Sequence, residues 1–232
     1  MNQLVTSAII LARTDYGEAD RILTLLTPDY GKLSLLAKGV RRVKSKLAGG
    51  IELFSVSDIT FIKGRGGVGT LVSTRLVKHY EHIVADLERT MLGYELLKRL
   101  NKVTEDQPES EYFDLLRGLF EALDDDEVPL AVVRFWFAAQ LLTLGGHMPN
   151  LRTEAGGNRL EAGRTYDFDF DRTAFRAAEP GREGRFTADH IKLLRLVFSG
   201  GSPKLLSKVA ALGTLLPACD ELVRHLTVVI PS

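Results

Sequence analysis

The hydrophobic pattern of this 232-residue chain changes its period near residue 79, and this change restricts the folds open to it. Before that point, apolar and β-branched residues form short runs separated by Gly, Pro, Asp and Lys, which is typical of strands and turns. After it, apolar residues recur every three or four positions, which is typical of amphipathic helices. The pattern predicts an α+β protein of two domains, residues 1–78 and residues 79–232.

The first domain contains five strand-like segments, at about residues 7–13, 21–27, 32–38, 51–63 and 69–77. Five short strands with little helix between them predict a small barrel of the OB-fold type, with an SH3-like barrel as the alternative. Pro28-Asp29-Tyr30-Gly31 joins the second and third segments and combines residues that favour tight turns. We therefore expect a hairpin at this point.

The third segment separates an apolar face from a cationic one, because successive side chains of a strand point to opposite faces. Alternation turns Leu33 and Leu35 inward and Lys32 toward solvent. The chain then leaves the strand and presents a run of cations, made up of Lys38, Arg41, Arg42, Lys44 and Lys46. Such a surface suits a polyanion, although charge runs also occur as ordinary solvated loops.

Charge is distributed unevenly along a chain whose formal net charge is zero. Residues 1–80 hold 12 Lys and Arg against 6 Asp and Glu, whereas residues 81–232 hold 18 against 24. A basic first third followed by an acidic remainder favours a polyanion-binding module joined to a domain with another task.

Aromatic side chains and a glycine-rich stretch extend the candidate nucleic-acid surface. Barrels that bind single strands combine a basic groove with aromatic stacking platforms, and Tyr16 and Tyr30 lie in predicted turns. Residues 64–69 match the dinucleotide pattern GxGxxG, but a β-run follows where the motif needs a helix. We interpret this stretch as a hairpin loop in which Lys63 and Arg65 are available to phosphates.

The second domain should be helical, apart from a loop-rich insertion at residues 146–186. A helix from about residue 80 to 100 has an expected apolar face made up of Tyr80, Ile83, Val84, Leu87, Met91, Tyr94, Leu97 and Leu100. The helix at 129–144 is apolar nearly all round and should be central to the domain. The remaining elements are helices at about 110–123, 187–198, 203–212 and 217–229, and a β-hairpin of residues 164–170 and 173–177.

No residue pattern in the chain predicts catalysis or a metal site. Cys219 is the single cysteine, so neither an internal disulfide nor a cysteine-based zinc site can form. His79 and His82 lack an evident third ligand, and the Asp167–Asp171 stretch lacks the later residues of a calcium loop. No apolar run reaches membrane-spanning length, and residues 1–7 lack a signal-peptide pattern. We expect a cytoplasmic protein with no membrane association.

Several runs in the first domain resemble the N-terminal domain of the bacterial RecO family of recombination mediators. The runs are residues 15–23, 27–33, 37–42 and 45–54. The helical half is similar more loosely, in its helix end at Leu144-Gly145, its hairpin insertion and its break at residues 200–203.

The resemblance implies an OB-fold and a helical domain without enzymatic turnover. It implies binding of single- and double-stranded DNA, strand annealing, cooperation with RecR, and help in loading RecA in the nucleoid. Many members carry a four-cysteine zinc finger in the insertion. This insertion has no cysteine, so we expect neither zinc nor another cofactor.

The resemblance also implies binding of the C-terminal tail of single-stranded DNA-binding protein (SSB) to the helical domain. A tail with acidic and aromatic residues requires a cation beside an apolar groove. The candidate cations are Arg134, Lys192, Arg195, Lys204 and Lys208. An RNA-binding OB protein and a purely protein-binding adaptor remain alternatives. A nuclease is disfavoured, because no clustered acids and histidines suit two-metal chemistry.

Overall fold

The computed structural model describes residues 2–64 and 66–228, which form two compact units. The barrel unit comprises residues 1–126 and the helical unit residues 127–232. The change of period after residue 78 therefore lies inside the barrel unit, whose described residues form three α-helices in addition to the strands.

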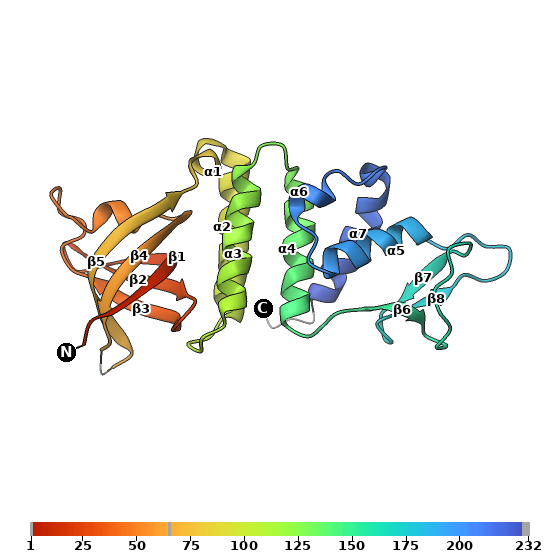
Figure 1. The fold of residues 1–232 in the computed structure, drawn as a ribbon, viewed down its shortest axis with the longest axis horizontal. Coiled ribbons are helices and arrows are strands. Elements are labelled where there is room, and N and C mark those ends of the chain that lie inside the picture. Colours follow the sequence, from red (N-terminus) through yellow and green to blue (C-terminus); the bar gives the residue numbers. More distant parts are fainter. Residues whose placement is uncertain (1, 65, 229–232) are drawn as a thin grey trace. The chain divides into compact units, whose positions relative to one another are not determined.

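The barrel unit begins with a closed five-stranded barrel, as predicted (Figure 1). Its strands are β1 (Leu4–Tyr16), β2 (Asp20–Thr27), β3 (Gly31–Ala37), β4 (Ser55–Ile62) and β5 (Val68–His79), and a 3-10 helix, η1 (Ala48–Gly50), precedes β4. Neighbouring strands are antiparallel, except for the parallel pair of β3 and β5 that closes the barrel in the order β1-β2-β3-β5-β4. This is the arrangement of an OB-type barrel.

The interior of the barrel confirms the alternation predicted for the third strand. Leu35 and Ala37 of β3 are buried in one cluster with Leu23 and Leu25 of β2. The outer faces of β1 and β2 are also covered, because α2 packs on β1 and α3 on β2. As a result, Leu26 is buried although it lies outside the interior cluster.

The helices of the barrel unit are α1 (Glu81–Ala85), α2 (Leu87–Val103) and α3 (Ser110–Asp124). The single helix predicted from about residue 80 is wrong, because Asp86 interrupts it and caps α2 by accepting a hydrogen bond from the Arg89 backbone. The interruption resets the helical phase. Consequently α2 buries Leu92 and Leu96 together with the predicted Leu97 and Leu100, whereas the predicted Leu87, Met91 and Tyr94 are 74%, 64% and 49% exposed.

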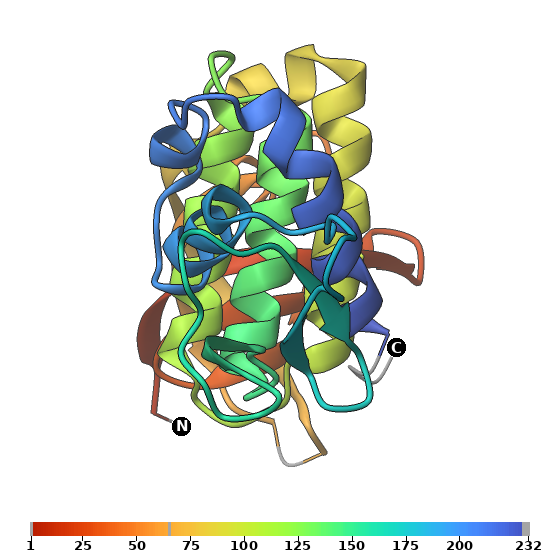
Figure 2. The same ribbon diagram turned by 90° about the vertical axis from the view of Figure 1, so that its right-hand side faces the viewer.

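The helical unit is built around α4 (Leu130–Leu144), which is buried on nearly all sides, as its sequence predicted. It packs against α5 (Ala188–Phe198), α6 (Pro203–Leu206) and α7 (Leu212–Thr227) (Figure 2). The predicted ends of the last two helices are wrong: α6 stops at Leu206, and α7 begins at Leu212 with Pro217 inside it. Among the described helices, none has both the length and the apolar composition needed to cross a membrane.

The insertion forms a small sheet of three strands in the order β6-β8-β7. The antiparallel pair β7 (Tyr166–Asp169) and β8 (Ala174–Ala177) is the predicted hairpin. The third strand, β6 (Asn150–Glu154), lies parallel to β8 and was missed, because it is short and its only fully buried residue is Leu151.

Candidate nucleic-acid interface

The basic loop, residues 38–46, is attached to the turn between β1 and β2. The Gly39 N–H donates to Asp20 Oδ1 at 2.7 Å, and the Arg41 N–H donates to the Ala19 carbonyl at 2.9 Å. Gly39 has a φ of +64°, which other residues adopt only at a cost in energy. These bonds fix the start of the loop against the barrel.

The cations of the basic loop face solvent, as the sequence predicted. The exposed residues are Lys38, Arg41, Arg42, Lys44 and Lys46. Tyr16 is 55% exposed at the end of β1 and pairs in register with Asp20, the residue that holds Gly39. The structure therefore brings the basic loop and Tyr16 together at one end of the barrel, which we call the basic end.

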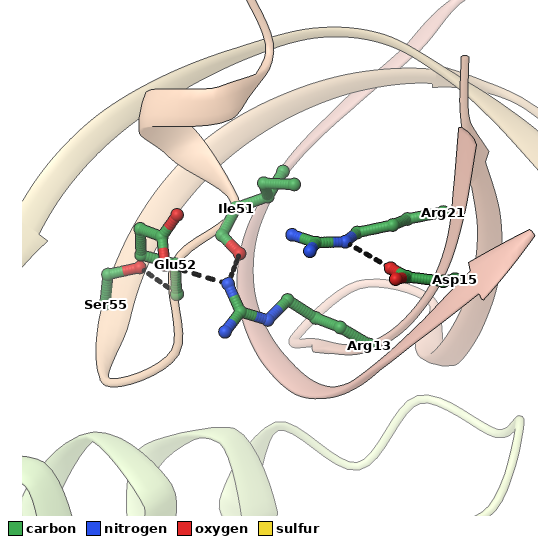
Figure 3. Close-up of polar contacts among 6 residues, drawn as sticks. All are labelled: Arg13, Asp15, Arg21, Ile51, Glu52 and Ser55. Atoms are coloured by element: carbon green, nitrogen blue, oxygen red, sulfur yellow. Dashed lines mark hydrogen bonds and ion pairs between the residues drawn. The ribbon is translucent and has the colours of Figure 1, made fainter. Parts of the chain in front are cut away.

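Two arginines that the sequence analysis did not single out also lie at the basic end. Arg21 Nε donates to Asp15 Oδ1 at 2.8 Å, and Arg13 Nη1 donates to Glu52 Oε2 at 2.8 Å. Figure 3 shows both guanidinium groups pointing toward the segment that carries Ile51 and Glu52. The hydrogen bond from Arg21 holds the pKa of Asp15 below its ordinary value, and Arg41, 3.6 Å from the other carboxylate oxygen, acts in the same direction.

Lys63 and Tyr30 lie at the opposite end of β2, around a cleft of about 230 Å³. The Lys63 ammonium is 4.9 Å from the centre of the Tyr30 ring, and that ring packs edge-on against Phe61 at 5.4 Å. Tyr30 is half-buried, so one side of its ring already serves the barrel core. Arg65, predicted to accompany Lys63, lies outside the described residues.

The expectation that Lys32 projects freely into solvent is wrong. Its ammonium donates to the carbonyl oxygens of Asn101 at 3.0 Å and Thr104 at 2.6 Å. Both carbonyls belong to the C-terminal end of α2, where unpaired carbonyls and the helix dipole favour a cation. Lys32 thus joins the barrel to the helices of its own unit.

The predicted DNA-binding residues therefore form two groups instead of one. The eight residues of β2 separate the basic end from the cleft of Tyr30 and Lys63, a distance of about 23 Å for an extended strand. The basic end holds the larger number of exposed cations, and we treat it as the principal candidate interface.

In the helical unit, an apolar groove of about 330 Å³ lies between α5 and the segment that begins α7. Leu193, Leu196 and Leu215 line it, and Lys192 stands beside them. Of the five candidate cations for a protein tail, Lys192 is the one that lines this groove. The Arg195 side chain donates to the Leu151 carbonyl, and Lys204 pairs with Glu127 at 3.2 Å. Arg134 is a half-buried residue of α4, and Lys208 is exposed.

The described residues contain no cluster of three or more potential metal ligands. His82 Nδ1 lies 3.0 Å from the carbonyl oxygen of Asp124, which gives this histidine a partner within its own unit. Burial raises the pKa of the Cys219 thiol to about 12, so the thiol is protonated at neutral pH.

The sequence matches two family models that together cover most of the chain. The model described as Recombination protein O N terminal matches residues 1–80, and the model described as Recombination protein O C terminal matches residues 85–226.

Curated relatives named DNA repair protein RecO align with somewhat less than two thirds of this chain. The protein of Acetivibrio thermocellus is 37% identical over 151 residues, which is 64% of this chain and 59% of the relative. That of Rhodopirellula baltica is 37% identical over 144 residues, which is 61% of this chain and 53% of the relative. A protein of Dehalococcoides mccartyi is 33% identical over 148 residues, which is 63% of this chain and 58% of the relative. The chain therefore spans less than two thirds of the length of these relatives.

Proposed function

Because the chain belongs to the Recombination protein O family, we propose that it is a non-enzymatic DNA-binding protein of DNA repair and recombination whose interface is the basic end of the barrel. The observation that carries this proposal is the basic loop, which presents five exposed cations and whose start is held by hydrogen bonds to the β1–β2 turn beside the exposed Tyr16. Exposed cations gathered on one loop suit phosphate contacts, and an exposed ring suits stacking on a base.

The salt dependence of binding follows from the number of phosphates contacted. If each of the five loop cations neutralises one phosphate of a single strand, log affinity should fall against log salt with a slope of roughly −3 to −4. Binding in this mode needs neither nucleotide hydrolysis nor a cofactor. This suits a mediator that presents or anneals strands, and we propose that it works with RecR and helps to load RecA in the nucleoid, as the resemblance of its sequence implies.

Fluorescence anisotropy of labelled single-stranded DNA, measured across a salt series, tests the interface. Arg41→Glu/Arg42→Glu should weaken binding at least about tenfold and reduce the slope by about 1.4, because two phosphate contacts are lost. Lys98→Glu/Lys102→Glu reverses the same number of charges on exposed positions of α2 and is the matched control. Equal losses in the two double variants would refute the assignment of the interface to the basic loop.

The same assay separates the alternative functions. An RNA strand of the same sequence that competes better than DNA would identify an RNA-binding protein, because only contacts to the 2′-OH distinguish the two. If the wild-type protein binds neither DNA nor RNA, the protein-binding adaptor is the alternative that remains.

A second proposal concerns the SSB tail and rests on the groove beside Lys192. An acidic tail with an aromatic residue would place its ring among Leu193, Leu196 and Leu215 and its carboxylates near the ammonium. Lys192 is now paired with Asp189 at 2.9 Å, one helical turn away, and both side chains are exposed. Exposed pairs of this kind are weak, so a ligand carboxylate can replace Asp189 at little cost.

A further inference from the structure

Arg13 and Arg21 occupy positions on the inner face of the barrel. Arg13 lies opposite Leu23 on β2, and Arg21 lies opposite Ala37 on β3. Residues directly opposite each other on neighbouring strands share a face, and both Leu23 and Ala37 belong to the buried interior cluster. At the basic end, the apolar rows of the interior are therefore continued by arginines.

A β-bulge places Arg13 on this face. The register between β1 and β2 shifts between Ile10 and Ala12, so alternation counted from the interior residue Ile10 moves by one position. Arg13 and Asp15 consequently face inward, where simple alternation would have placed Ala12. Bulges re-aim side chains in this way, and they are common at the rims of barrels and beside functional sites.

Three guanidinium groups meet two carboxylates at this rim. Asp15 accepts from Arg21 and lies 3.6 Å from Arg41, and Glu52 accepts from Arg13. The electrostatic effects of Arg13, Arg21 and Arg41 all reach Asp15, so the cluster is a single unit with one excess positive charge. Arg21 reaches Asp15 through Nε alone, and its two terminal nitrogens have no hydrogen-bond partner among the described residues.

The ion pairs are open to exchange with a ligand. The side chains of Arg21 and Arg41 are 30% and 37% exposed, and that of Asp15 is 54% exposed. Arg41 is also an exposed residue of the basic loop, so a strand that follows the loop would arrive at this cluster. Arginine guanidinium groups bind phosphate through bidentate hydrogen bonds. A single carboxylate shared between two arginines cannot form a bidentate pair with both of them.

We propose that Arg13, Arg21 and Arg41 form a phosphate-binding site for the DNA backbone, in which the Asp15 carboxylate occupies the place of the phosphate until DNA binds. The site deepens the proposed function and rests on it. A phosphodiester oxygen replaces Asp15 on Arg21 and Arg41, while Arg13 remains anchored by Glu52 and the Ile51 carbonyl. Asp15 then acts as an internal competitor that lowers affinity for DNA and excludes weaker anions.

A double-mutant cycle measured by anisotropy with single-stranded DNA tests this site. Asp15→Asn keeps the side-chain shape and should tighten binding about two- to fivefold, the range expected for release of an exposed ion pair. Glu18→Gln removes the same charge from an exposed position in the turn that follows β1, without releasing an arginine, and should change affinity less. In an Arg21→Gln background the gain from Asp15→Asn should be clearly smaller, because only Arg41 then remains to be released.

Each outcome of the cycle is decisive. A gain from Asp15→Asn that equals that of Glu18→Gln, or that is undiminished in Arg21→Gln, would overturn the site while leaving the basic loop as the interface. In that case the arginines only close the end of the barrel. If urea unfolding shows that Arg21→Gln is not folded, Arg41→Gln on the exposed loop replaces it in the cycle. A wild-type protein that does not bind DNA would overturn the proposed function itself, and the site with it.

Discussion

Substitution of Gly31 should destabilise the barrel unit far more than substitution of another glycine with the same backbone conformation. Gly31 has a φ of +64°, and a Cβ atom there would lie 2.2 Å from the Gln107 carbonyl oxygen, 2.5 Å from its carbonyl carbon and 2.9 Å from the Asp106 carbonyl carbon. All three are backbone atoms, which cannot rotate away. Gly31→Ala therefore forces the loop between α2 and α3 away from the barrel.

The expected loss has two parts. A left-handed conformation costs alanine roughly 1–2 kcal/mol. Moving the loop adds about 1–3 kcal/mol of overpacking strain, and it weakens the hydrogen bond from the Lys32 N–H to the Glu105 carbonyl, now 3.1 Å long. We expect Gly31→Ala to lower the free energy of unfolding by about 2–5 kcal/mol, which is a large part of the stability of an ordinary domain.

Gly17→Ala is the matched control. Gly17 has a φ of +57°, and a Cβ atom at this position would have no neighbour within 4 Å, so the variant should lose only the conformational part, about 1–2 kcal/mol. Urea unfolding followed by circular dichroism measures both variants, with similar slopes expected. Equal losses of about 1–2 kcal/mol in the two variants would refute the argument that the α2–α3 loop is tightly packed against Gly31.

Two further variants test other assignments. Lys32→Met should lower the free energy of unfolding by about 1–2 kcal/mol, because two carbonyls at the end of α2 lose a charged donor. The affinity of this variant for DNA, measured by anisotropy, should stay within about twofold of the wild-type affinity. A tenfold loss of affinity would show that Lys32 belongs to the interface. Lys192→Glu should weaken binding of a fluorescent acidic tail peptide at least about fivefold. Arg176→Glu, an exposed charge reversal on β8, should leave this binding unchanged. Equal affinities of the wild type and both variants would exclude the groove as the tail site.

The sequence predicted the parts of the fold that depend on local pattern. The five strands, the apolar helix α4 and the hairpin of β7 and β8 are each governed by periodicity, turn residues and burial over a few neighbours. The first half of the face of α2 was predicted wrongly because Asp86 resets the helical phase, and a single residue that caps a helix is not visible in a count of apolar spacing.

The candidate site was predictable only in part, for a related reason. The basic loop is contiguous in sequence, so its exposed cations could be identified from the residues alone. Arg13 and Arg21 depend on a bulge and on pairings between strands, and the fate of Lys32 depends on carbonyls about seventy residues away. Such relations exist only after the chain has folded, and no pattern of spacing encodes them locally.

The packing of α2 and α3 on the outside of the barrel determines how this protein can be dissected. A fragment that stopped at residue 80 would contain every strand of the barrel, yet it would expose Ile9 and Leu26, which are buried in the whole chain. It would also leave the Lys32 ammonium without its carbonyl partners. Two apolar strand faces opened to water in this way favour self-association. The smallest fragment suited to isolated study of the barrel therefore extends to residue 126, where the compact unit ends.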